Sequence, residues 1–215
     1  MALLAIAPYA AWMALMFILP AGAQSYAARS LATLAVFAAA AFHARRSLAA
    51  AFRMPRFSDI AAGVLVGFAV FVLWVAPEDI EAYRRFCVIG GAAAAGSSPY
   101  DPASCGWPLT LARLAGSAFV IAPAEELFFR FFLYRRLQSG DWTRVDRRVF
   151  DLSAFLWSVG LFALEHDRIV AGAAAGAIYL LLYMRRGLAA AIAAHVVTNF
   201  ALGIYVIKTG LWNFW

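Results

Sequence analysis

Residues 109–133, which read LTLARLAGSAFVIAPAEELFFRFFL, decide the fold of this chain. The stretch is long and apolar enough for a membrane-crossing helix, which needs about 20 residues. Its second half nevertheless carries Glu125, Glu126 and Arg130. A charged side chain at mid-membrane costs at least about 2.5 to 3.5 kcal/mol on insertion scales. We therefore interpret these residues as part of a functional cluster inside a transmembrane helix.

The rest of the chain repeats this apolar pattern. Of its 215 residues, 65% are hydrophobic and only 14% are charged, too few polar residues to cover a soluble domain. Period-2 alternation is scarce, which argues against a β-barrel. We predict an all-α, polytopic transmembrane helical bundle of about seven spans. The expected spans are residues 2–20, 26–42, 60–77, 109–133, 152–166, 169–184 and 188–207.

The first expected span is followed by Ala21-Gly22-Ala23, which resembles a signal-peptidase site. No Lys or Arg precedes the span, however, and it is longer than a usual signal core. We expect it to be retained. The whole chain is then one integral membrane domain, with N-terminal helices and an outer loop in residues 1–108 and a helical catalytic core in residues 109–215.

Basic residues predict the orientation in the membrane. The net charge is +6, but the basic side chains gather in short loops, which favours topology signals and lipid contacts over nucleic acid. The strong patches follow the second, fourth and sixth spans: Arg45, Arg46, Arg53 and Arg56; Arg135, Arg136, Arg144, Arg147 and Arg148; Arg185 and Arg186. The positive-inside rule then places the N-terminus in the cytoplasm and the C-terminus outside, in an inner (cytoplasmic) membrane.

The longest polar connection, residues 78–108, is expected outside. It holds the only cysteines, Cys87 and Cys105. An exterior compartment permits a disulfide between them, and two unpaired thiols are the alternative. Gly63 and Gly67 form a small-xxx-small pair that predicts close helix packing.

Polar side chains recur in two further spans. His166 closes the fifth, and His195 and Asn199 share a face of the seventh. In the fourth span, Glu126 and Arg130 are four residues apart and can form an ion pair. Glu125 is rotated from Glu126 by about 100° and stays free to accept a proton. Two histidines and one free carboxylate are the groups needed to hold and deprotonate a water. The alternatives are a purely structural Glu126–Arg130 pair and an Asn199 that only joins helices.

These residues resemble the motifs of one known family. Glu125-Glu126-Leu-Phe-Phe-Arg130, Phe162-Ala-Leu-Glu-His166 and His195-Val-Val-Thr-Asn199 occur in the order found in the CAAX prenyl protease and bacteriocin-processing (CPBP) family of intramembrane proteases. The resemblance covers roughly residues 109–207. The C-terminal tail, with Gly210-Leu-Trp-Asn-Phe-Trp215, is similar to the CAAX-protease-related proteins associated with exosortase systems.

The resemblance implies a glutamic-type intramembrane protease with no metal and no cofactor. It implies that Glu125 activates the attacking water, that His166 holds this water, and that His195 and Asn199 stabilise the oxyanion. Supporting roles fall to Glu126, Arg130 and Phe162. The implied partner is a membrane-embedded or lipid-associated protein or peptide substrate, with exosortase-system proteins as further candidates.

Two alternatives remain open at the sequence level. A zinc protease could use Glu125, His166 and His195 as ligands, since Glu and His suit zinc, although the chain has no His-Glu-x-x-His helix. A non-enzymatic scaffold or partner of an exosortase-type sorting system could carry the same intramembrane polar groups.

Overall fold

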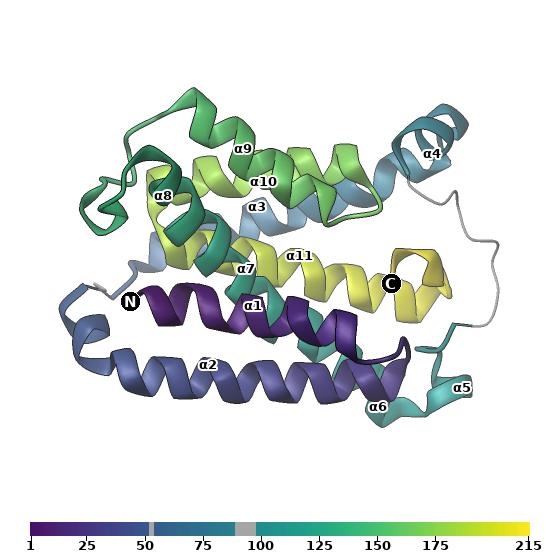
Figure 1. The fold of residues 1–215 in the computed structure, drawn as a ribbon. Coiled ribbons are helices and arrows are strands. Elements are labelled where there is room, and N and C mark those ends of the chain that lie inside the picture. The colour runs from purple at the N-terminus through teal and green to yellow at the C-terminus, as the bar shows by residue number, and fades with distance from the viewer. Residues whose placement is uncertain (52–53, 89–97) are drawn as a thin grey trace.

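The computed structural model describes residues 1–51, 54–88 and 98–215, with the side chains of 46–51 left out. Arg46 and Arg53 of the first basic patch therefore lie outside the described side chains. The described parts are helical and form no β-strand, which confirms the all-α prediction (Figure 1). The elements are α1 (Ala2–Ile18), α2 (Ala23–Ala51), α3 (Phe57–Val75), η1 (Ala76–Asp79), α4 (Glu81–Cys87), α5 (Pro102–Cys105), α6 (Trp107–Ala115), η2 (Gly116–Ile121), α7 (Ala122–Glu126), η3 (Leu127–Leu133), α8 (Tyr134–Gln138), η4 (Trp142–Arg144), α9 (Leu152–Leu164), α10 (Ile169–Arg186), α11 (Leu188–Thr209) and η5 (Trp212–Phe214).

Four helices among the described residues are long and apolar enough to cross a membrane: the part of α2 up to Arg45, α3 together with η1, α10 and α11. Seven spans are thus not confirmed. The helices α1, with 17 residues, and α9, with 13 residues, fall short of the roughly 20 residues that a bilayer requires.

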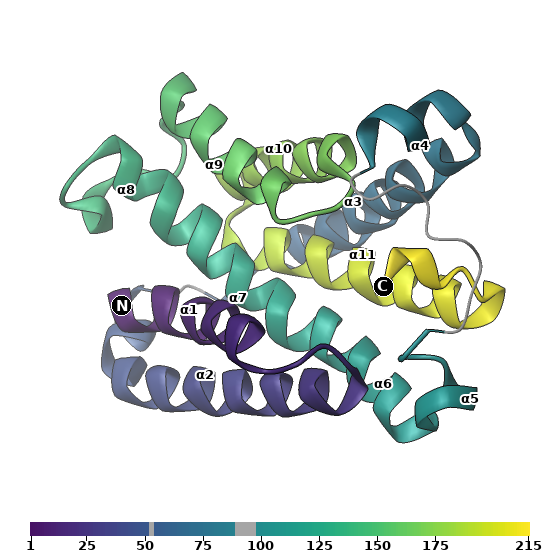
Figure 2. The same ribbon diagram turned by 45° about the vertical axis from the view of Figure 1, so that its right-hand side comes forward.

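The fourth apolar run forms one continuous helical rod over residues 107–138, which crosses the bundle obliquely (Figure 2). Two wider π-helical turns, η2 and η3, interrupt its α-helical geometry on either side of α7. Such turns insert an extra residue and are frequent at functional sites. The two glutamates of the first motif lie in α7, between them.

The α3 and α11 helices pack closely together. A Cβ atom added at Gly63 would lie 2.5 Å from the carbonyl oxygen of Ala190, and one at Gly67 would lie 2.5 Å from that of Ala194. The close packing predicted from the glycine spacing is confirmed. Because α3 comes from residues 1–108 and α11 from residues 109–215, the two parts form one bundle.

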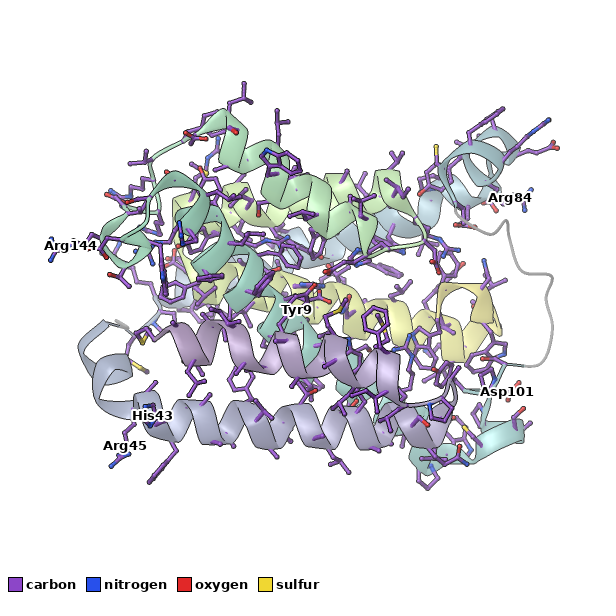
Figure 3. All side chains as sticks on the ribbon, in the orientation of Figure 1. Tyr9, His43, Arg45, Arg84, Asp101 and Arg144 are labelled. Atoms are coloured by element: carbon purple, nitrogen blue, oxygen red, sulfur yellow. The ribbon has the colours of Figure 1, made fainter. Side chains whose placement is uncertain are left out.

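Basic side chains gather at one end of this bundle. Figure 3 shows Arg45 and Arg144 at this end, and Arg84 and Asp101 at the opposite end. Arginines from all three patches also line one cavity there, of about 670 Å³: Arg56, Arg135, Arg147, Arg148, Arg185 and Arg186. The alternation of the patches along the sequence therefore corresponds to one physical end of the molecule, and the side of the membrane that it faces stays a prediction.

The two cysteines are free thiols in the structure. Cys87 ends α4, and Cys105 ends α5, where its Sγ lies 3.6 Å from the hydroxyl of Thr110. Of the two sequence-level alternatives, the structure contains the unpaired thiols.

The α3–α11 contact predicts a position-specific loss of stability. Gly63→Ala forces a methyl group against the Ala190 backbone, which cannot rotate away, and should destabilise the protein by about 1 to 3 kcal/mol. The free energy of unfolding in mixed micelles measures this loss. Gly160→Ala on α9 is the matched control, because nothing lies within 4 Å of its added Cβ. Equal stability of the two variants would contradict the close packing.

Candidate active site

A buried ion network forms the base of the site. Glu126 Oε2 lies 3.3 Å from Arg130 Nε, and Glu126 Oε1 lies 2.9 Å from His195 Nδ1. Glu126 is fully buried, and Arg130 and His195 are 1% and 3% exposed. The predicted Glu126–Arg130 ion pair is confirmed. The contact with His195 was not predicted, because it depends on how α11 packs against α7.

Glu125 faces away from this pair, as its position along the helix predicts. Its side chain is 12% exposed, and Oε2 lies 3.5 Å from His195 Nε2. The imidazole of His195 therefore lies between two carboxylates, one buried and one facing the cavity. The ring of Tyr179 stacks on it with the centroids 4.8 Å apart, which fixes the plane of the imidazole.

His166 lies just after the end of α9, beyond its C-cap Glu165. Its Nδ1 is 2.8 Å from the carbonyl oxygen of Phe162. Since a carbonyl only accepts, Nδ1 carries the donated proton and the neutral ring keeps its lone pair on Nε2. The rings of Phe162 and Trp74 pack against the imidazole at 4.7 Å and 5.3 Å, so the second-motif phenylalanine supports the histidine directly.

Asn199 lies one helical turn after His195 on α11. Its Nδ2 donates to the carbonyl oxygen of Ser117, at 3.0 Å. This bond holds the amide in place and uses one of its two N–H groups. Ser117 belongs to the π-helical segment η2, so the irregular turn of the rod helps to orient a side chain of α11.

The structure brings the four main candidates together. Glu125, His166, His195 and Asn199 line one cavity of about 380 Å³. Asp167, Phe214 and Trp215 also line it, so the cavity extends toward the end of the molecule that carries the C-terminal tail. Of the remaining candidates, Phe162 also lines the cavity, and Glu126 and Arg130 are buried beside it.

Several cavity residues were missed by sequence reasoning. Tyr179 and Thr198 form a 2.7 Å hydrogen bond behind His195, and neither stands out in an apolar helix. Arg29 and Arg113 also line the cavity. Each lies inside an apolar run, and a charged residue in such a run is a signal that could have revealed them.

The zinc alternative finds no support in the arrangement of the side chains. In the part of the chain that the structure describes, no group of three or more His, Cys, Asp or Glu side chains could hold a metal ion. One nitrogen of His195 is already bonded to Glu126. Glu125, His166 and His195 line the same cavity, but their side chains are not grouped as the ligands of a metal ion are.

Comparison with known proteins gives one match. Residues 107–201 match the family model described as type II CAAX prenyl endopeptidase Rce1-like. No curated protein and no solved structure matches the chain. The matched region includes the rod, α9, α10 and the part of α11 that holds His195 and Asn199, and it therefore contains all seven candidate residues. Residues 107–201 are thus similar to the Rce1-like family of type II CAAX prenyl endopeptidases.

Proposed function

We propose that the chain is an intramembrane endopeptidase that hydrolyses a peptide bond in a membrane-associated protein or peptide with a glutamate-activated water. One observation carries this proposal. A free carboxylate, an imidazole and a side-chain amide, drawn from three parts of the chain, line one cavity in an otherwise apolar bundle. The family match over the same residues supports a protease.

Glu125 is the general base in this proposal. Its carboxylate faces the cavity, and the lone pair on His166 Nε2 is available to accept a hydrogen bond from the same water. Glu125 takes a proton from the water, and the resulting hydroxide attacks the carbonyl carbon of the scissile bond. The two acceptors, one on α7 and one just after the end of α9, orient the water for this attack.

Asn199 and His195 stabilise the oxyanion of the tetrahedral intermediate. The second N–H of the Asn199 amide points to this role, and His195, whose Nδ1–H is donated to Glu126, donates from Nε2 to the oxyanion as the imidazolium, with a proton on each ring nitrogen. The intermediate collapses when the C–N bond breaks, and Glu125 returns its proton to the leaving amine. Glu126 and Arg130 take no part in proton transfer and hold His195 in position.

The substrate reaches this site from within or beside the bilayer. The cavity is lined by both polar and aromatic side chains, including Trp12, Trp74 and Tyr179, which suits an apolar peptide segment with a polar backbone. The C-terminal tail residues alone suggest that the substrate comes from an exosortase-type system. They are also the only basis for placing the chain in the exosortase-associated subgroup. A cytoplasmic N-terminus rests on the basic patches.

Glu125→Gln should abolish proteolysis while leaving the protein folded. The substitution removes the proton acceptor but keeps the size and the hydrogen-bonding shape of the side chain. Mass spectrometry of membrane-protein fragments should show products in cells that carry the unaltered chain and none with Glu125→Gln. The amount and the melting temperature of the variant should match those of the parent.

Glu81→Gln is the matched control, because Glu81 lies on α4, is exposed and is remote from the cavity. It should retain full activity. Fragments that persist with Glu125→Gln would contradict the assigned role. Full rescue of a deletion phenotype by Glu125→Ala would favour the scaffold alternative.

Asn199→Ala should lower the rate of product formation in isolated membranes by about 10²- to 10³-fold, the usual cost of losing one oxyanion donor. The effect should fall on kcat rather than on KM, because the missing bond forms mainly in the transition state. A variant that instead loses stability and retains its rate per folded molecule would identify Asn199 as a residue that only joins helices.

Chelation separates the glutamic mechanism from the zinc alternative. Product formation in isolated membranes should persist in the presence of EDTA or 1,10-phenanthroline, because the proposed water is activated by Glu125 alone. The metal content of the purified chain gives a second measurement. Inhibition by chelators that zinc reverses would overturn the metal-free mechanism.

A further inference from the structure

Two arginines line the cavity beside a single tyrosine ring. Arg29 comes from α2 and Arg113 from α6. Their guanidinium carbons lie 5.1 Å and 4.1 Å from the ring centroid of Tyr26. Arg29 also stacks on Trp12 at 4.2 Å, and Arg113 lies 5.6 Å from the ring of Trp215. Both belong to the cavity that holds Glu125 and His195.

Neither arginine has an acidic partner in the described part of the chain. Among the residues that the structure describes, no carboxylate forms an ion pair with Arg29 or Arg113. The Nε atom of each is buried and lacks a hydrogen-bond partner in the same described part. Two like charges are therefore held close together in a half-buried site, which is unfavourable unless an anion compensates them.

Stacking on aromatic rings satisfies only part of this requirement. A ring attracts the face of a guanidinium group and offsets about 0.5 to 2 kcal/mol. The five N–H donors of arginine lie in the plane of the group, at its edges. The rings of Trp12, Tyr26 and Trp215 thus fix the two guanidinium groups and leave their donor edges for another group. Planar, bidentate acceptors such as carboxylates fit these edges best.

Arg113 lies on the same rod as the proposed water-activating residue. Arg113, Ser117, Ile121 and Glu125 all line the cavity at intervals of four residues along the rod. Twelve residues at no more than 1.5 Å each place Arg113 at most about 18 Å from Glu125 along the rod, since the π-helical segment η2 lies between them. An extended peptide covers that distance with about five residues, at roughly 3.4 Å per residue.

We infer that Arg29 and Arg113 form a carboxylate subsite of the substrate cavity, which binds an anionic group of the substrate up to about five residues from the cleaved bond. That the bound molecule is a substrate rests on the proposed function. That the subsite binds a carboxylate rests on the two arginines, which have no acidic partner among the described residues. The carboxylate belongs either to a free chain end or to an acidic side chain. A peptide is favoured over a lipid phosphate because the cavity is shared with Glu125, His166 and His195.

A binding measurement tests the subsite without requiring catalysis. The full chain with Glu125→Gln, reconstituted in nanodiscs, is titrated with a fluorescent N-acyl Ala-Leu pentapeptide that has a free C-terminal carboxylate. Two companion peptides have a C-terminal amide instead. The first keeps the same sequence, and the second has Glu as its last residue. Fluorescence anisotropy gives the three affinities. Binding can thus succeed even if the protein proves not to be a protease, so the two proposals fail separately.

The carboxylate peptides should bind about 10- to 100-fold more tightly than the plain amide, as expected for a charge-assisted pair. Tight binding of the free-acid peptide would show that the subsite recognises a chain end. Tight binding of the amide peptide that ends in Glu would show that it recognises an acidic side chain. Arg29→Gln and Arg113→Gln should each abolish most of this preference. Arg84→Gln is the matched control, because Arg84 is exposed on α4, and it should preserve the preference.

Equal affinity for the acid and amide peptides in the chain with both arginines intact would overturn the inference, even if neither arginine variant folds. A preference that survives both substitutions would overturn it too. A third overturning result is binding of dihexanoyl phosphatidylglycerol, dependent on both arginines, without any binding of the carboxylate peptides. That result would identify a lipid phosphate as the occupant.

Discussion

The rest of the site depends on one constraint, which is the charge of the fully buried Glu126. A buried carboxylate is tolerated only when it is paired and hydrogen-bonded, and loss of one partner costs about 3 to 5 kcal/mol. Here Arg130 and His195 are the partners. Arg130 in turn lies 4.2 Å from the ring centroid of Phe162 and donates to the carbonyl oxygen of Gly176. One acidic group therefore links the rod with α9, α10 and α11.

Two adjacent glutamates acquire different properties because a helix turns between them. Glu126 points into the bundle, and both of its carboxylate oxygens contact its two partners, Arg130 and His195. Glu125 points into the cavity, where its only ion-pair partner among the described residues is the far nitrogen of His195, at 3.5 Å. The same imidazole contacts both carboxylates, so the structural pair positions the reactive one. The two residues are of the same type, and they differ only in the direction in which their side chains point.

The domain matched by the family model does not enclose the cavity alone. Helices α1 and α2, which precede residues 107–201, supply Trp12, Tyr26 and Arg29 to its wall. The α3 helix packs against α11 through glycines, and Thr198, next to Asn199, donates to the carbonyl oxygen of Gly67. The side chains of the three motifs are thus supported from outside by helices that carry no motif. Differences in these helices can change what the cavity accepts while leaving the water-activating groups in place.

The sequence by itself determined the helical class, the membrane environment, the Glu126–Arg130 pair and the seven candidate residues, because each depends on local spacing or on the cost of charge in an apolar run. The seven spans that it predicts stay unconfirmed, because four helices among the described residues are long and apolar enough to cross a membrane. Only the tertiary structure decided that His195 bridges both glutamates, that Tyr179 stacks on it, and that Arg29 and Arg113 share the cavity. The contacts of His195 with the glutamates join residues up to 70 positions apart, and no helical period relates side chains on different helices.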